Sequence, residues 1–516
     1  MFRLSSALFL CTCVVQIGRV FSAVSLSFDP SAPPLHVVSP SYLSVNIDTG
    51  SLYNNLNFSD VALRAFTSYL TAAAPTQLRI GGGAADSTLF TGVGGASGSC
   101  GGLQPGIDIC VSGESWDEIM EFVGATGVGL VWDINAAFMR KSGTDPWNTT
   151  NAAALLAHAS GARARGLPAP VAFQLGNEPE DWYKRSPPLN ITGSILASDF
   201  AALRQLLRGI PGLPRPALYG PDGCCEGRRA LMEEFAEVSS ALGCLDGVTV
   251  HAYPLANTPD TCDIPHYLNR SAMMTLKDAV VGWQQLASPL LAAGVPLIQG
   301  ETATSAHGGC ANLSNTYVAG FTFMLELGAL GGWGVSQVNR QDLVGWSAEG
   351  VPSNYALLGQ PGWAGGFLAP HPDYFTALLW KQLVGGRVLN SSFVGSAVPA
   401  DSIDLHVWCS KEGGGLVVTF FNAGALGAPL LLPEGTPSAP RREFILTSSP
   451  EGSSMDTLAG ERVYLNGVLL SADELGGLSP PFPYQGRYAV EGEPITLPPL
   501  SYGFFQLSQA APACAA

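Results

Sequence analysis

Two glutamates in this sequence each follow an apolar run, at the point where a buried strand would end. Glu178 follows Phe173–Gly176 and Asn177, and Glu301 follows Leu297–Gly300. In a barrel of parallel strands, side chains at the C-terminal ends of the strands face the substrate. Both carboxylates are therefore candidates for chemistry. The alternatives are a surface turn for Glu178 and a paired structural carboxylate for Glu301.

Two such carboxylates can hydrolyse a glycosidic bond. Retaining glycosidases need carboxyl groups about 5–5.5 Å apart, one to protonate the leaving oxygen and one to attack the anomeric carbon. The chain between Glu178 and Glu301 is long enough to place them on the fourth and seventh strands of one barrel, facing one mouth. The sequence thus predicts Glu178 as the acid/base and Glu301 as the nucleophile. Asn177 is expected to donate to a sugar hydroxyl.

The elements that must position these residues are repeated βα units. From about residue 40 to 390, short β-like runs alternate with helix-length segments, which is typical of such units. Eight strands are predicted, the number that closes a (β/α)8 barrel. One of the predicted helices spans Ala272–Ala292. The eight strands are Leu43–Ile47, Gln77–Ile80, Val128–Trp132, Ala172–Leu175, Ala217–Gly220, Val248–His251, Pro296–Gln299 and Gly334–Val338.

The C-terminal part of the chain has a different pattern. After Leu389 the sequence alternates between short strands and turns and shows no convincing helix, which favours a β-sandwich. A chain of 516 residues is also too long for one compact hydrophobic core, which suggests a large domain and a smaller second domain. We therefore expect an α/β catalytic domain followed by a sandwich.

Composition limits the function classes. The 25 basic and 41 acidic residues give a net charge of −16, which repels nucleic acid and disfavours broad polyanion binding. The sequence has isolated basic pairs but no basic patch. Hydrophobic residues make up 47% of the chain and charged residues 13%, as expected for a well-buried globular protein.

The N-terminus predicts a secretion signal over residues 1–23. Arg3 is followed by the apolar run Ala7–Val15 and a plausible cleavage site at Val20–Ser22. The run is shorter than the ~20 residues that span a bilayer, and no later segment qualifies as a span. Peripheral membrane association stays open, and a monomer is expected. Six N-x-S/T sequons are consistent with secretion.

Cleavage of the signal peptide would remove Cys11 and Cys13, so nine cysteines would be available to form disulfides in an oxidising compartment. The number is odd, so one thiol stays free or pairs elsewhere. Cys224, Cys225 and Cys244 are not assigned to pairs. A metal cluster from them is not expected because no histidine accompanies them at ligand spacing. We expect neither a metal nor another cofactor.

Several blocks resemble the heparanase and β-glucuronidase family, glycoside hydrolase family 79. Gly-Asn-Glu-Pro indicates the clan whose acid/base is an Asn-Glu pair on the fourth strand, and the N-terminal and Gly-Glu-Thr blocks indicate the family. The resemblance covers nearly the whole mature chain. Its blocks are Pro34–Val45, Leu78–Gly82, Trp147–Asn151, Gly176–Pro179, Gly300–Thr302 and Pro372–Tyr374.

The resemblance implies a domain plan and roles for particular residues. A sandwich strand would come from residues 24–40, the barrel from residues 41–388 and the rest of the sandwich from residues 389–516. Glu178 matches the proton donor of the family and Glu301 its nucleophile. Positions that line the sugar subsites match Asp48, Asn177, His251, Tyr253 and Gln341, and the group that receives a uronate carboxylate matches Gly308, Gly309 and Tyr355.

Backbone N–H groups of Gly308, Gly309 and Tyr355 can bind an anion without net positive charge. Arg79 and Arg340, at strand ends, are expected to support the carboxylates electrostatically.

The resemblance also implies a disulfide between Cys409 and Cys514. Cys100 with Cys110 would close a local loop, and Cys262 with Cys310 would join two loops beside the site. Taken as lone residues, His251 and Tyr253 also fit core positions on a strand.

The chain departs from the family at the carboxylate pocket. His307 stands where heparanases have Tyr, and Gly83-Ala84 stands where they have Thr-Lys. A Gly-rich segment, Gly92–Gly106, replaces the long basic linker that heparanases excise, so a single-chain enzyme is expected. The predicted function is hydrolysis of β-linked glucuronic acid in glycans or proteoglycans.

Two alternatives remain, a retaining β-glycosidase for a neutral sugar and a silent glycan-binding relative. Endo or exo action, and extracellular or lysosomal or vacuolar location, stay open.

Overall fold

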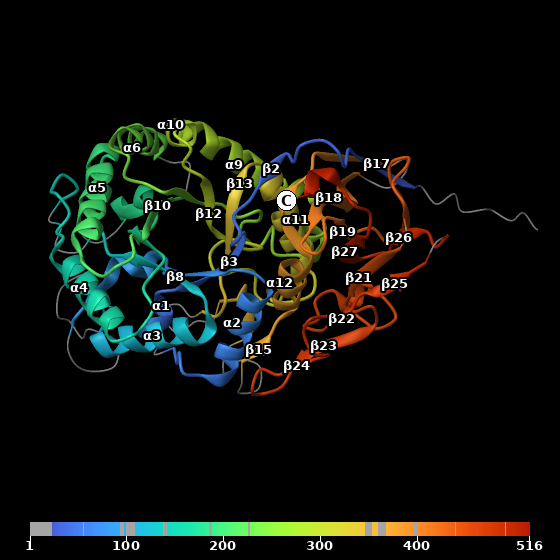
Figure 1. The fold of residues 1–516 in the computed structure, drawn as a ribbon, viewed down its shortest axis with the longest axis horizontal. Helices are drawn as coiled ribbons and strands as arrows, with labels where there is room; N and C mark the ends of the chain where they lie inside the picture. Colours follow the sequence, from blue (N-terminus) through green and yellow to red (C-terminus); the bar gives the residue numbers. More distant parts are fainter. Residues whose placement is uncertain are drawn as a thin grey trace, which may run out of the picture.

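The computed structural model describes residues 23–54, 56–92, 98–99, 109–137, 140, 142–184, 188–224, 228–345, 353–359, 368–395, 400–438, 440–490 and 492–515. Most of the predicted signal peptide and of the Gly-rich segment at residues 92–106 lies outside the described residues, as do Cys100 and Cys225. Two bodies lie side by side along the long axis, a helix-ringed barrel and a body of packed sheets (Figure 1).

The first body is a closed barrel of eight parallel strands, in the spatial order β10-β11-β12-β13-β3-β4-β8-β9. Each strand is an apolar run that is buried along nearly its whole length, as parallel strands covered by helices must be. The predicted (β/α)8 fold class is therefore confirmed. The strands are β3 (Leu43–Asp48), β4 (Gln77–Gly81), β8 (Gly129–Ile134), β9 (Ala172–Leu175), β10 (Ala217–Gly223), β11 (Gly247–His251), β12 (Leu297–Thr302) and β13 (Val335–Arg340).

The helices around the barrel begin and end at local signals. The Asp60 side chain accepts from the backbone N–H of Leu63 at 2.8 Å and caps α2 (Val61–Ala73). Ser112 caps α3 (Gly113–Thr126) in the same way, and Gly127, with φ of 71°, ends it. The remaining long helices are α4 (Thr150–Ala164), α5 (Gly193–Gly209), α6 (Arg229–Leu242), α9 (Thr275–Leu286), α11 (Ala319–Gly332) and α12 (Pro372–Leu383).

The predicted helix Ala272–Ala292 is wrong as one element. The structure has α8 (Arg270–Met273), α9 and α10 (Ser288–Ala292) in its place. Pro289 has no N–H to donate and its ring would clash with the preceding turn, so α9 ends at Leu286 and Pro289 stands in the first turn of α10.

The second body is a sandwich of two sheets. The small sheet has the order β17-β1-β20-β26, and the large one runs β2-β16-β18-β19-β27-β21-β22-β23-β24, with β25 beside β21. One apolar cluster fills the space between them, with members from β1, β18, β19, β20, β26 and β27. The small sheet has β1 (Val24–Phe28), β17 (Ser391–Gly395), β20 (Ala428–Leu431) and β26 (Ile495–Leu497). The large sheet has β2 (His36–Val37), β16 (Val384–Val388), β18 (Ile403–Ser410), β19 (Leu416–Asn422), β21 (Arg441–Thr447), β22 (Val463–Leu465), β23 (Val468–Ala472), β24 (Leu478–Ser479), β25 (Arg487–Ala489) and β27 (Ser501–Leu507).

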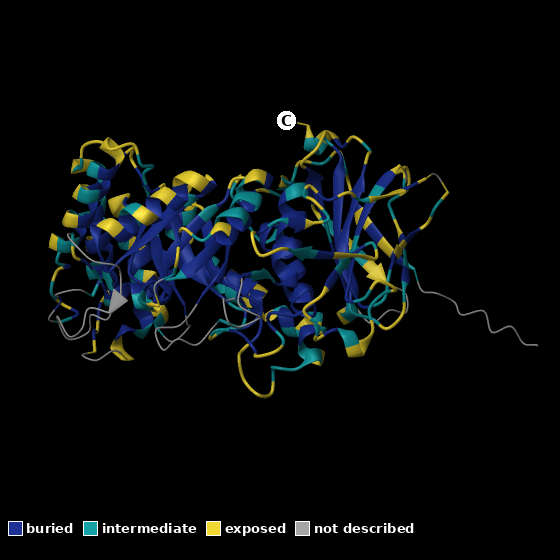
Figure 2. Cartoon of the chain, turned by 90° about the horizontal axis from the view of Figure 1, so that it is seen from below, coloured by how far each residue is buried: buried dark blue, intermediate teal, exposed yellow. Residues whose placement is uncertain are grey.

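Helices α11 and α12 join the two bodies. Aromatic pairs connect them to the large sheet, with ring centroids 5.4 Å apart for Trp380 and Trp408 and 5.7 Å apart for Phe321 and Phe421. Figure 2 shows the buried residues continuing from the barrel through these helices into the sheets. Strand β16 follows α12 directly and pairs with β18, so the C-terminal strands of the large sheet begin at Val384, while the expected boundary is at residue 389.

Candidate active site

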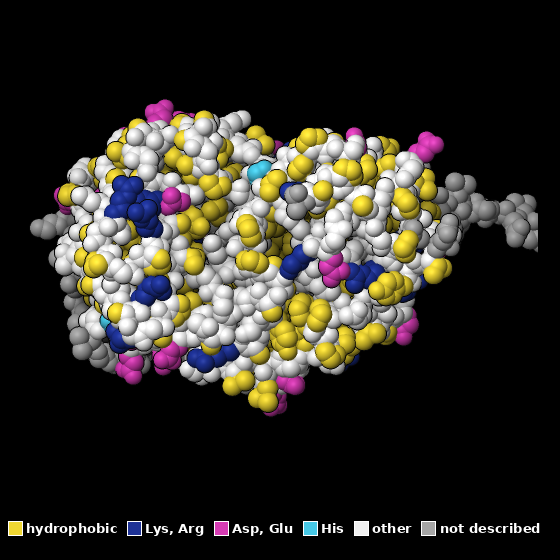
Figure 3. Space-filling view, viewed as in Figure 1, with side chains coloured by type: hydrophobic (Ala, Val, Ile, Leu, Met, Phe, Trp, Pro, Cys, Tyr) yellow, Lys and Arg dark blue, Asp and Glu magenta, His cyan; other side chains and the backbone are white. Residues whose placement is uncertain are grey.

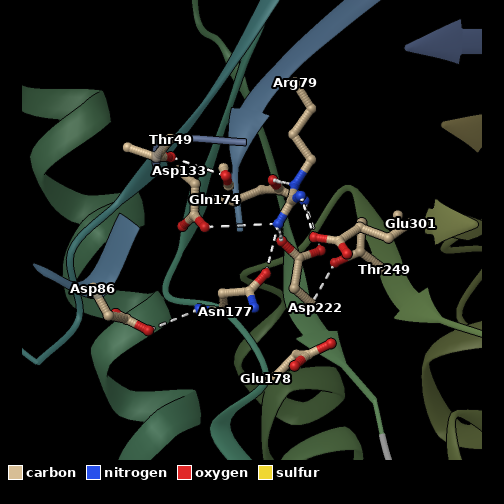
Figure 4. Close-up of polar contacts among 12 residues, drawn as sticks. Thr49, Arg79, Asp86, Asp133, Gln174, Asn177, Glu178, Asp222, Thr249 and Glu301 are labelled. Carbon is tan, nitrogen blue, oxygen red and sulfur yellow. Dashed lines mark hydrogen bonds and ion pairs between the residues drawn. The ribbon is translucent and has the colours of Figure 1, made fainter. Parts of the chain in front are cut away.

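The polar residues at the C-terminal ends of several barrel strands converge on the guanidinium of Arg79, which is fully buried (Figure 4). Its Nη1 donates to Oε1 of Glu301 at 2.7 Å, and its Nε donates to Oε1 of Gln174 at 2.7 Å. Its Nη2 donates to Asn177 and to Asp222, each at 2.8 Å. One arginine on β4 therefore links residues that β9, β10 and β12 deliver to the same mouth.

The structure brings Glu178 and Glu301 together. One oxygen of each carboxylate and one ring nitrogen of His251 all lie within 4.8 Å of one another. The His251 Nδ1 lies 2.9 Å from Oε1 of Glu178 and 3.8 Å from Oε2 of Glu301. The Glu178 side chain is 31% exposed and that of Glu301 only 9%. The two carboxylates thus share one site but differ in their access to solvent.

A tight turn presents Asn177 and Glu178. Gly176 has φ of 75°, and a Cβ there would lie 2.5 Å from Trp182 and 2.8 Å from Ala136, so only glycine fits. Glu178 itself has φ of 48°, a conformation that non-glycine residues rarely adopt. The hydrogen bond from its N–H to the carbonyl of Asp222 at 3.0 Å holds it there.

The surroundings of Glu301 favour its carboxylate form. Burial raises its pKa, but the positive charges of His251 and Arg79 outweigh that effect, so the pKa lies below its usual range. Tyr253 also donates to Oε2 of Glu301 at 2.9 Å. Both oxygens of this carboxylate therefore have a donor.

His251 is a buried cation in this cluster. Burial lowers its pKa, but the charges and hydrogen bonds of Glu301, Asp222 and Glu178 raise it to about 10. The three atoms that lie within 4.8 Å could in principle share one metal ion. In the observed arrangement Nδ1 of His251 lies at hydrogen-bond distance from Glu178, a contact that allows the two groups to share a proton.

Sequence reasoning missed two acidic residues of this cluster, Asp222 and Asp133. Asp222 on β10 accepts from Arg79 and, at 2.7 Å, from Gln174. Asp133 on β8 lies 3.7 Å from Arg79, and burial raises its pKa well above the usual range. Each is the polar residue at the end of an otherwise apolar strand. That shared position was the signal that could have found them.

The residues matched to a uronate pocket lie on two adjoining loops. Gly308 and Gly309 have φ of 81° and 82°, and a Cβ on Gly309 would lie 3.1 Å from the backbone nitrogen of Tyr355. The Tyr253 and Tyr355 rings stack with centroids 6.4 Å apart. His307, with φ of 51°, is exposed, so the structure places it at the surface of this loop.

The other residues expected at the site are divided between the site and the barrel exterior. Asp48 lies close enough to Glu301, Glu178 and Arg79 to feel their charges, and burial raises its pKa to about 7. Gln341, which follows β13, is buried. Arg340 instead faces the outer helices, where it pairs with Asp373 at 3.0 Å. The expectation that Arg340 supports the two glutamates therefore differs from its observed contacts.

Two disulfides lie at the expected pairs. Cys262 and Cys310 have Cα atoms 5.5 Å apart and connect the loop after β11 to the loop that carries Gly308. Cys409 and Cys514 have Cα atoms 5.3 Å apart and tie the C-terminal tail to β18. Among the described cysteines, Cys244 is a buried free thiol.

Comparison with known proteins shows what this chain is similar to. The heparanase of Bos taurus is 27% identical over 92% of this chain and 90% of its own. A hyaluronoglucuronidase of Hirudo nipponia is 25% identical over 77% of this chain and 76% of its own. The solved 4-O-α-L-rhamnosyl-β-D-glucuronidase of Fusarium oxysporum has the same fold, with a TM-score of 0.65, 14% identity and coverage of 94% of this chain and 100% of its own. Residues 42–328 match the N-terminal domain of glycosyl hydrolase family 79. With more than half of its length matched in this way, the chain belongs to glycosyl hydrolase family 79.

Proposed function

We propose that this protein is a retaining β-glycosidase that hydrolyses β-linked glucuronic acid in glycans or proteoglycans. The observation that carries the proposal is the approach of Glu178 and Glu301 oxygens to within 4.8 Å. Retaining enzymes keep their carboxyl groups about 5–5.5 Å apart, whereas inverting enzymes need about 6.5–9.5 Å to admit a water. The observed approach lies on the retaining side of this comparison and supports that mechanism.

The different surroundings of the two glutamates support different roles. Glu301, ionised and held by Arg79 and Tyr253, attacks the anomeric carbon. The more exposed Glu178 gives its proton to the glycosidic oxygen as the bond to the leaving group breaks. In the second step Glu178 takes a proton from water, which attacks the same carbon and releases Glu301 as a carboxylate.

Backbone amides near Tyr355 support recognition of a uronate. Asn257 and Asn354 hold the carbonyl of Gly309, and the backbone N–H of Asn354 donates to the carbonyl of Gly308 at 2.7 Å. We find no partner for the Gly308 N–H among the described residues. Such an N–H, in the residue before Gly309, can bind a carboxylate without a net positive charge.

The surface charge also fits recognition of a single uronate by local contacts. On the face seen in Figure 3, Lys and Arg side chains form small separate groups and no broad basic patch. With a net charge of −16, long-range attraction to a polyanion is weak. Local contacts to one uronate must then supply the binding.

Secretion is part of the proposal. The Cys262–Cys310 and Cys409–Cys514 disulfides require an oxidising compartment. None of the helices in the described part of the chain is long and apolar enough to cross a membrane. Secretion from a eukaryotic host, with both disulfides intact by mass spectrometry, tests this point.

The central experiment measures hydrolysis of an aryl β-glucuronide by the wild type, Glu178→Gln and Glu301→Gln from pH 4 to pH 7. Glu233→Gln, an exposed carboxylate on α6, is the matched control. Both site variants are expected to lose at least ~1,000-fold in kcat/KM, and NMR of the first product is expected to show retained configuration. Wild-type rates in either variant, or an inverted product, would refute the assignment.

A parallel panel of aryl β-glycosides tests the sugar. Faster hydrolysis of a neutral glycoside than of the glucuronide would contradict the uronate proposal and keep the retaining mechanism. Tight binding of an oligosaccharide with no hydrolysis of any glycoside would contradict both.

A further inference from the structure

Asp222 is a fully buried carboxylate that contacts both cations of the site without reaching the substrate mouth. Its Oδ2 accepts from Arg79 at 2.8 Å, and its Oδ1 lies 3.6 Å from Nε2 of His251. Arg79 in turn donates to Glu301, and His251 contacts Glu178. One aspartate thus stands behind the two groups that hold the two glutamates.

The main chain of Asp222 adds a second connection. Its carbonyl accepts from the N–H of Glu178 at 3.0 Å, and its own N–H donates to Oγ1 of Thr249 at 2.9 Å. Asp222 and Glu178 both have positive φ, 55° and 48°. Such backbone costs energy and persists only where its surroundings fix it. The turn that presents Glu178 therefore depends on the strand that carries Asp222.

The charges agree with this arrangement. Burial raises the pKa of Asp222, but the guanidinium of Arg79 and then His251 bring it down to about 2. Around His251, the titratable and charged groups are Glu301 on β12, Asp222 on β10, Glu178 and Glu180 after β9, Arg79 on β4, and Tyr253 after β11. Asp222 is the anion on the Nε2 side, and the two glutamates lie on the Nδ1 side. If Asp222 were uncharged, Nε2 of His251 would lose its only ion-pair partner among the described residues.

We propose that Asp222 is a positioning residue that holds Arg79 and His251 against the nucleophile and the acid/base. Its consequence for turnover rests on the proposed function. Its consequence for His251 does not, because that residue can be observed without any substrate. The two can therefore fail separately.

The test is Asp222→Asn, which keeps the shape and removes the charge. We would titrate protein with labelled histidine by NMR, assigning the His251 signal with His251→Gln. The substitution is expected to lower the pKa of His251 by about one unit or more, as removal of a buried charge within ~4 Å requires. With aryl β-glucuronide, kcat is expected to fall about 100-fold, with KM nearly unchanged because Asp222 does not reach the substrate.

Asp199→Asn is the matched control. Asp199 is also buried and paired with an arginine, Arg140, at 2.5 Å, but lies on α5 outside the cluster. It is expected to lower the melting temperature while leaving His251 and kcat as in the wild type. An equal loss of kcat and an equal His251 shift in both variants would reduce Asp222 to a general structural role and overturn the proposal.

Two further results decide the remaining cases. An unchanged His251 titration in folded Asp222→Asn overturns the proposal, whether or not the wild type hydrolyses the glucuronide. If Asp222→Asn does not fold, the wild type alone is tested at pH 8, where both ring nitrogens of His251 are expected to carry protons. A neutral imidazole at that pH would overturn the proposal.

Discussion

Glu326 is a buried carboxyl group on α11, a helix whose described side chains are nearly all buried. Its Oε1 accepts from Thr302 at 3.3 Å, and its Oε2 has no hydrogen-bond partner among the described residues. Burial raises its pKa from the ordinary 4.5 to about 8, although the charge of Arg340 opposes the shift. The folded protein therefore keeps this group protonated at neutral pH.

The size and sign of the effect follow from linkage. Between pH 4.5 and pH 8 the folded state holds a proton on Glu326 that the unfolded state has released, so stability falls as pH rises. From pH 5 to pH 8 the loss from this group is about 3 kcal/mol, to order of magnitude. Glu326→Gln removes the titration. The variant is expected to gain stability relative to the wild type as pH rises, with little difference near pH 5.

Thermal unfolding followed by tryptophan fluorescence at pH 5, 6.5 and 8 measures this difference. Comparison across pH cancels any constant cost of the glutamine amide. Glu233→Gln, on the exposed side of α6, serves as a control and is expected to follow the wild type at every pH. Parallel curves for Glu326→Gln and the wild type would refute the reasoning, because a neutral Glu326 is its only basis.

Three further predictions concern the site. Arg79→Lys keeps the charge but cannot contact four acceptors at once, so it is expected to lower the melting temperature. It is also expected to move the acidic limb of the kcat/KM profile to higher pH, because a cation that contacts Glu301 less closely opposes the effect of burial less. Tyr253→Phe removes a donor to Glu301 and is expected to lower kcat about 10- to 100-fold, measured at the pH optimum, with the melting temperature as the control for folding. Asp48, whose pKa burial raises to about 7, becomes charged above that pH, so KM for an anionic glucuronide is expected to rise there in the wild type and to rise less in Asp48→Asn; equal profiles would contradict this.

The sequence predicted the barrel well because each strand carries its own signal. The eight runs are short, apolar and bounded by turn or polar residues, and the observed strands match them to within a few residues. The same local signal marked Glu178 and Glu301, since each is the first acidic residue after such a run. Several strands of the sandwich were missed, β16 among them. Gly385 and Gly386 interrupt the pattern of β16, and pairing with β18 and β2, distant in sequence, makes it a strand.

Contacts between distant strand ends could not be predicted from the sequence. Arg79 and Glu301 are 222 residues apart, and Arg79 and Asp222 are 143 apart. No local pattern says that one guanidinium will meet both, because that depends on the order and twist of the closed barrel. Likewise, Arg340 ends a strand as Arg79 nearly does, yet the pleat turns it toward α12 and Asp373.

By itself, then, the sequence determined the strands, the turns and the chemical types at their ends, because these depend on neighbours along the chain. The tertiary structure decided which of those ends meet, and with that the charge state of each group. Glu301 is ionised and His251 doubly protonated only because buried charges from other strands lie a few ångströms away, where low dielectric makes their interaction strong.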